Sequence, residues 1–249
     1  AGCWPCPCRC VAAAWKRLRE GRYVNVKDDA SWRLLIGFLL STVSPTGPYP
    51  VLLLTGEQGS AKSTAARVIR SLIDPSESPL RAEPREVRDL LIAARNGWIV
   101  ALDNLSKMPD WLSDALCRLS TGGGFATRAL YSDADEIILD AQRPTIITGI
   151  SDVAVRGDLL DRPITVELPR IPDHERRLER DLWAAFEAER PALLGALLDA
   201  VVGALARRHE VHLARPPRMA DFATWVTAAE PALGWEDGAS WTPTPRTAP

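Results

Sequence analysis

Lysine is scarce in this sequence. Arginine supplies most of the basic side chains among 249 residues, and GC-rich coding is a sufficient cause of that bias. The formal net charge is −2, which excludes a strong overall attraction to nucleic acid or an anionic membrane but allows a local basic face. A lysine retained inside a glycine-rich loop is therefore more informative than usual. The lysines are Lys16, Lys27, Lys62 and Lys107.

Long hydrophobic runs are also missing. The uncharged stretch from Leu34 to Gly56 is interrupted by Ser44–Pro50, and neither side of it reaches the ~20 apolar residues that span a bilayer. No signal-peptide pattern opens the chain. We therefore expect a cytoplasmic protein with no membrane partner. The composition, 46 % hydrophobic and 25 % charged, is that of an ordinary globular protein.

Cysteines cluster at the start of the chain, where four thiolates could bind zinc. Their spacing is very tight, and Pro5 and Pro7 stiffen the run. We therefore favour a poorly ordered end over a metal site. Cys117 lies in an apolar helical pattern and is interpreted as a core residue. The clustered residues are Cys3, Cys6, Cys8 and Cys10.

The order of apolar patterns predicts an α/β domain followed by helices. Short, fully apolar runs are typical of parallel strands that are covered on both faces, and amphipathic helical periods separate them. Two further strand-like runs flank Ser132–Asp135 and predict a hairpin. The expected core strands are 51–55, 98–102, 145–148 and 164–168, the hairpin strands are 125–131 and 136–139, and the helices are 31–43, 62–73, 84–95, 109–120, one around 178–186, 193–205 and 219–229.

These patterns divide the chain into four parts. They predict an α/β fold class, with a central parallel sheet, a β-hairpin insertion and a C-terminal helical lid. The parts are a poorly ordered segment at 1–28 with a helical patch at 11–19, a core at 29–170, a lid at 171–235 and a loose tail at 236–249.

A glycine-rich loop follows the first apolar strand and precedes a helix, as in the pattern G-x-x-x-x-G-K-[ST]. In such loops, backbone N–H groups and the helix N-terminus bind phosphate. Lys62 is expected to reach the β- and γ-phosphates and Ser63 to hold Mg²⁺. Ala61 replaces the second glycine, which is tolerable if its φ is negative. A chance glycine-rich turn is disfavoured by the flanking elements. The expected ATP-binding residues are Gly56, Glu57, Gln58, Gly59, Ser60, Ala61, Lys62, Ser63 and Thr64.

An acidic residue ends the second apolar strand. Asp103 is expected to bind the water shell of Mg²⁺, although an Asp that only caps the turn is the alternative. Hydrolytic motors usually carry Glu at the next position, where this chain has Asn104. An amide can orient water but cannot accept its proton, so ATP binding is better supported than fast hydrolysis. Glu57 is a weak substitute for that base.

From residue 51 to residue 168, the order of motifs resembles superfamily 3 helicase and primase-helicase ATPases of viruses and mobile elements, within the AAA+ class. The motifs are the phosphate loop, the strand ending in an acid, Thr121–Gly124, and a hairpin with Arg128 and Tyr131. The chain resembles more closely the uncharacterised ATP-binding proteins found beside primase-like genes in bacterial mobile elements. That likeness lies in Gly56–Thr64, Trp111–Leu116, Asp158–Arg162 and Pro217–Asp221.

The resemblance implies roles for further residues. Thr148 stands where these helicases place a sensor Asn. Arg162 matches the position of an arginine finger that acts on a neighbouring subunit's γ-phosphate, with Arg156 as second candidate and an ion pair to a nearby Asp as the alternative. Arg218 could contact phosphate as a second sensor, or be an ordinary exposed arginine. The resemblance also implies that the core at 29–170 is a P-loop NTPase of the AAA+ type, that is, an ATPase core, and that the protein forms a homo-oligomeric ring.

Two functions remain open. The first is an ATPase of mobile-element replication that acts on single-stranded nucleic acid, or with a primase-like partner. The second is a nucleotide-dependent assembly switch with little hydrolysis. The acidic hairpin tip Ser132–Asp135 would repel phosphates and favours the second, as does Asn104. A small-molecule kinase fits poorly, since it accounts for neither the hairpin nor the trailing helices.

Overall fold

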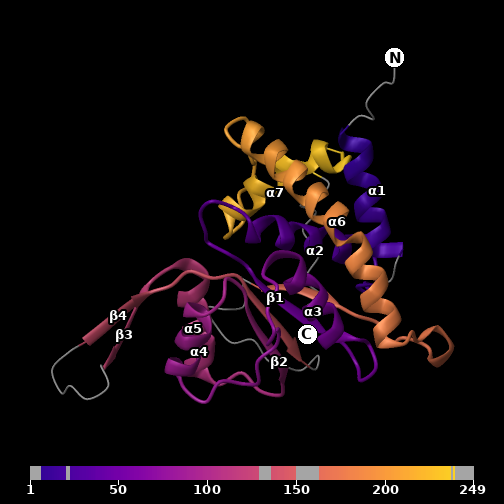
Figure 1. The fold of residues 1–249 in the computed structure, drawn as a ribbon. Helices are drawn as coiled ribbons and strands as arrows, with labels where there is room; N and C mark the ends of the chain where they lie inside the picture. The colour runs from indigo at the N-terminus through magenta and orange to yellow at the C-terminus, as the bar shows by residue number, and fades with distance from the viewer. Residues whose placement is uncertain (1–6, 21–22, 129–135, 150–162, 237, 239–249) are drawn as a thin grey trace.

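A parallel sheet lies at the centre of the fold (Figure 1). The computed structural model describes residues 7–20, 23–128, 136–149, 163–236 and 238. Its four parallel strands have the order β2-β5-β1-β6. Beside β2, the Arg81 backbone forms a single parallel bridge with Leu102. The strands are β1 Val51–Thr55, β2 Val100–Leu105, β5 Thr145–Gly149 and β6 Pro163–Glu167.

Both faces of the sheet are covered at the inner strands β1 and β5, which are buried at every position, whereas alternate residues of the edge strand β6 are exposed. Side chains alternate between the faces of a strand, so Leu52 and Leu54 enter one hydrophobic cluster while Val51 and Leu53 enter the other. Helices α2 and α3 cover the first face, and α4 and α5 cover the second. The helices are α2 Asp29–Thr42, α3 Lys62–Ile73, α4 Val87–Arg95 and α5 Asp110–Thr121.

A layer of helices packs beyond α2 (Figure 1). It consists of α1 (Pro7–Glu20), α6 (Glu179–Arg207) and α7 (Ala220–Leu233), with α6 packed against both others. The Trp225 indole N–H donates to the Leu40 carbonyl at 3.0 Å and so fixes α7 onto α2. The hairpin of β3 (Gly124–Arg128) and β4 (Glu136–Asp140) extends away from the sheet on the side of α4 and α5.

Most expected elements are present, and several boundaries differ. Helix α4 starts at Val87 and not at Pro84, and β2 runs from Val100 to Leu105. The two helices expected around 178–186 and at 193–205 form one helix, α6, although Pro191 lies inside it. Proline removes one backbone hydrogen bond. Buried contacts on both sides of it, through Phe186 and Leu193, keep the helix continuous.

The N-terminal segment differs from the expectation of poor order. Within it, Pro7–Glu20 forms α1, which packs against α6. Trp15 and Leu18 are buried, and Tyr23 stacks edge-on against Phe186 with ring centroids 5.5 Å apart. The sequence pattern predicted only the inner part of this helix, because its partner α6 is distant in sequence. The boundaries of the expected domains stay a prediction.

No helix among the described residues is long and apolar enough to cross a bilayer. The expected turn at Ser132–Asp135 and most of the expected tail lie outside the described residues. Within the described part of the chain, no group of three or more His, Cys, Asp or Glu side chains is arranged to hold a metal.

The packing of α1 is tested by Leu18→Ala. Leu18 is 2 % exposed, so its truncation should lower the free energy of unfolding by about 3 kcal/mol, measured by denaturant titration. Ala13→Gln, at an exposed position of the same helix, should leave it nearly unchanged. Equal, small effects of the two substitutions would show that α1 does not pack on the core.

Candidate functional site

The loop between β1 and α3 is held by backbone geometry that only glycine allows at two positions. Gly56 has φ 148°, and a Cβ there would lie 2.3 Å from the Leu168 carbonyl oxygen. Gly59 has φ 85°, and its carbonyl accepts the Ile171 N–H at 3.2 Å. The Leu168 N–H donates to the Thr55 carbonyl at 2.8 Å. The loop is therefore fixed to the segment that leaves β6.

Ala61 has the left-handed conformation, with φ 61° and ψ 33°. It is the residue that precedes α3, and its carbonyl accepts the Ala65 N–H at 2.9 Å. The condition under which alanine was expected to be tolerable, a negative φ, is not met. A Cβ in this conformation costs roughly 1 kcal/mol because it approaches the following carbonyl oxygen.

Lys62 folds back over the loop. Its ammonium donates to the carbonyls of Gly56 at 2.6 Å and Glu57 at 2.9 Å. An ammonium has three N–H donors, so these two bonds leave one. The amine is thereby held at the loop and not extended into solvent.

Three polar side chains meet where β1, β2 and β5 end. The Ser63 hydroxyl and the Thr148 hydroxyl both donate to Asp103 Oδ1, at 2.8 Å and 2.6 Å. Register explains the meeting, since Leu102 pairs with Ile147 and the next residues along the two strands are Asp103 and Thr148. Thr148 is buried and Ser63 is exposed, so the carboxylate stands between the core and an open edge.

Asn104 occupies a bulge. The pairing of β2 with β5 shifts between Leu102 and Leu105, and Asn104 there has φ 56°. The Asn104 N–H donates to the Thr148 hydroxyl at 2.8 Å. Asparagine enters the left-handed region more readily than most residues. The left-handed conformation at this bulge therefore explains why asparagine follows Asp103. Bulges of this kind often change the direction of side chains beside active sites.

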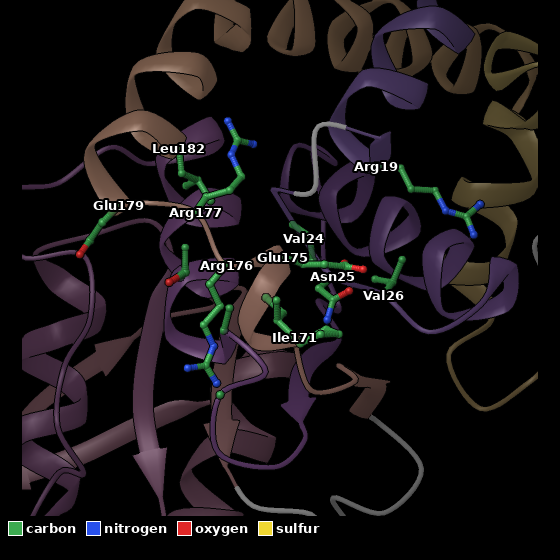
Figure 2. A pocket seen from close by; sticks show the side chains of 14 residues that line it. Arg19, Val24, Asn25, Val26, Ile171, Glu175, Arg176, Arg177, Glu179 and Leu182 are labelled. Carbon is green, nitrogen blue, oxygen red and sulfur yellow. The ribbon is translucent and has the colours of Figure 1, made fainter.

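A cavity of about 530 Å³ opens next to the loop (Figure 2). Gly59, Ala61 and Thr64 line it from the loop side. The opposite walls come from Val24–Val26, Ile171 and Leu182, so apolar side chains from distant parts of the chain enclose it. The Asn25 amide donates to the Pro169 carbonyl at 2.6 Å, which fixes the 24–26 segment against the residues that follow β6.

Charged side chains surround this cavity. Arg19, Arg176 and Arg177 line it together with Glu175 and Glu179. The cavity lining therefore carries more cationic than anionic side chains.

Glu179 is turned toward α3. Hydrogen bonds from the Arg67 guanidinium and the Trp183 indole lower the pKa of the Glu179 carboxyl. The Arg67 guanidinium also lies 4.9 Å from the centroid of the Trp183 ring. These contacts join the start of α6 to α3, the helix that follows the glycine-rich loop.

A model of replication proteins of actinomycete integrative conjugative elements matches residues 20–242. The chain belongs to this family. Its assignment to the replication machinery of a mobile element is therefore confirmed, at the level of the family. No curated protein matches the sequence significantly.

Solved structures show the fold family at low identity. The apo structure of the NrS-1 C-terminal region is 14 % identical with a TM-score of 0.50, over 76 % of this chain and 45 % of that one. A crystal structure of JCV helicase with a bound acetamide compound is 13 % identical, with a TM-score of 0.45. That match covers 88 % of this chain and 60 % of the helicase chain. The chain thus spans less than half of the NrS-1 structure, and that likeness supports only the coarse α/β fold.

The structure brings together most of the predicted site. The loop residues 56–64 and Asp103 converge at the carboxyl ends of the strands. Arg218 is exposed just before α7 and does not line the cavity, whereas Arg162, Arg156 and Tyr131 lie outside the described residues. The sequence patterns missed Asn25 and Arg176, because a cavity formed by segments some 150 residues apart leaves no local signal.

The strain at Ala61 predicts a stabilising substitution. Ala61→Gly should raise the free energy of unfolding by about 1 kcal/mol, and so the melting temperature by about 2–4 °C, because glycine adopts positive φ without steric cost. Ala65→Gly, inside α3, is the control and should lower the melting temperature. A lower melting temperature for Ala61→Gly would contradict the left-handed conformation.

Proposed function

We propose that this chain binds Mg-ATP and acts as an ATPase in the replication of an actinomycete integrative conjugative element. The observation that carries the proposal is the contact of the Ser63 hydroxyl with Asp103 at 2.8 Å, directly beside Lys62 and the glycine loop. Membership of a replication-protein family supports the biological setting.

The loop suits a polyphosphate chemically. It precedes α3, whose N-terminal N–H groups carry partial positive charge. Lys62 adds a full charge that is already held in place by two loop carbonyls. Its remaining N–H and the loop amides would stabilise negative charge on phosphate oxygens.

The oxygen donors also suit Mg²⁺. This ion prefers oxygen ligands, keeps several waters, and is usually held by one or two carboxylates together with substrate phosphates. The hydroxyl of Ser63 and the carboxylate of Asp103 supply two such groups. When bound, the ion would neutralise charge on the phosphates. Thr148 orients the carboxylate from the buried side.

The cavity beside the loop suits the nucleoside. Its volume of about 530 Å³ lies within the usual range for small-molecule sites, and its apolar walls can pack against a base. Thr64 and Ala61 join it to the phosphate loop, so a nucleotide could occupy both at once. This continuity favours a nucleoside triphosphate over an isolated phosphate.

A nucleotide-dependent assembly switch is the second candidate function. Asn104 favours it, because no carboxylate base follows Asp103 and the position is fixed by its bulge. In either function the chain would form a homo-oligomeric ring, in which Arg162 of one subunit acts on the nucleotide of the next. Single-stranded nucleic acid or a primase-like protein would be the further partner.

Binding is tested by calorimetric titration with Mg-ATP. Lys62→Ala should abolish detectable binding, since it removes the charge that faces the phosphates. Lys107→Ala, which removes an exposed lysine beyond β2, is the matched control and should bind like the unaltered protein. Binding by Lys62→Ala with unchanged affinity would exclude the phosphate-loop assignment.

Turnover separates the two candidate functions. If the chain is an ATPase, single-stranded DNA should stimulate its ATP hydrolysis. Asp103→Asn should then reduce the hydrolysis rate by at least about 100-fold, because the metal ligand is lost. Asn104→Asp supplies a carboxylate that tolerates left-handed backbone, and it should raise slow turnover if the missing base limits the rate. Tight binding without turnover, with or without DNA, would favour the switch.

A further inference from the structure

We infer that Arg176 is a phosphate-binding residue of the same chain's nucleotide site, held in reserve by an ion pair with Asp173. The inference rests on the proposed nucleotide function and adds a residue that the motif pattern does not contain. Arg176 lines the cavity beside the loop, whereas Arg218, which the resemblance suggested as a sensor, does not.

The position of the Arg176 guanidinium carries the inference. Its Nη2 would lie 3.2 Å from a Cβ built on Gly59, so it lies directly over the middle of the phosphate loop. Arg176 also lines the cavity that runs along the loop (Figure 2). A phosphate chain on the loop would therefore meet this guanidinium, whose planar donors suit two phosphate oxygens.

The backbone holds Arg176 at this place. The Ile171 N–H donates to the Gly59 carbonyl at 3.2 Å, and a short 3-10 turn at Asp173–Glu175 follows. Arg176 ends that turn through its own N–H to the Asp173 carbonyl, and α6 begins three residues later. A contact between Arg176 and phosphate would thus connect the loop with the start of α6.

Asp173 competes for the guanidinium. Arg176 Nη2 lies 2.8 Å from Asp173 Oδ1, and the two side chains are 50 % and 76 % exposed. An ion pair this exposed is weak, because water screens it. A polyphosphate bound on the loop would carry more negative charge than a single carboxylate, so it would be the stronger acceptor for the same donors.

Two substitutions of opposite expected sign test the inference. Arg176→Ala should weaken Mg-ATP binding about tenfold, the value of one charge-assisted contact at a half-exposed site. Asp173→Asn keeps the shape but removes the competing charge, and it should tighten Mg-ATP binding severalfold. Arg180→Ala is the matched control, since this arginine is 83 % exposed, pairs with Asp181 and does not line the cavity.

Calorimetric titrations of these variants, of the unaltered protein and of Lys62→Ala distinguish the outcomes. Weaker binding by Arg176→Ala, tighter binding by Asp173→Asn and no change in Arg180→Ala support the inference. The inference is overturned if Arg176→Ala binds Mg-ATP within twofold of the unaltered protein, or if Arg180→Ala loses as much affinity as Arg176→Ala. The proposed function still stands in these cases if Lys62→Ala has lost binding. Weaker binding by Asp173→Asn shows a structural ion pair and also overturns it. No binding by the unaltered protein ends both proposals.

Discussion

Strand register in the parallel sheet is the constraint on which the candidate site depends. Because β5 lies between β1 and β2, its Thr148 reaches Asp103 at the end of β2, while Ser63 approaches the same carboxylate oxygen from the helix after β1. A shift of one residue in either pairing would turn Thr148 or Asp103 to the opposite face. The hydrogen bonds from Ser63 and Thr148 to Asp103 therefore require this register.

Strained backbone concentrates at this edge of the sheet. The two non-glycine residues with positive φ in the described part of the chain are Ala61 and Asn104, and they flank the Ser63–Asp103 contact. Each conformation is held by hydrogen bonds of the surrounding backbone, with Ala61 capping α3 and Asn104 bound to Thr148. Strain of this kind is commonly retained where a site requires it.

The helical layer is joined to the loop at two places. Backbone hydrogen bonds tie Gly59 to Ile171 after β6, and the Arg67, Glu179 and Trp183 side chains tie α3 to α6. Because α6 also packs on α1 and α7, these contacts connect the helix after the loop with all three helices of the layer. This connection suits both proposed functions, since a motor and an assembly switch each need ligand binding to move a distant surface.

The sequence by itself determined the elements whose signal is local. Runs rich in apolar residues predicted the four core strands, the glycine-rich pattern predicted a loop between the first strand and a helix, and α3 begins and ends where its periodicity predicted. Asp103 was predicted from the same kind of local pattern, an acid after an apolar run, and the structure places it beside Ser63. Only the tertiary structure decided what depends on contacts between distant segments: the packing of α1 on α6, the continuity of α6 through Pro191, the bulge that selects Asn104, and the position of Arg176 over Gly59. Local patterns record hydrogen bonding and burial along one element, whereas these features arise where separate elements meet.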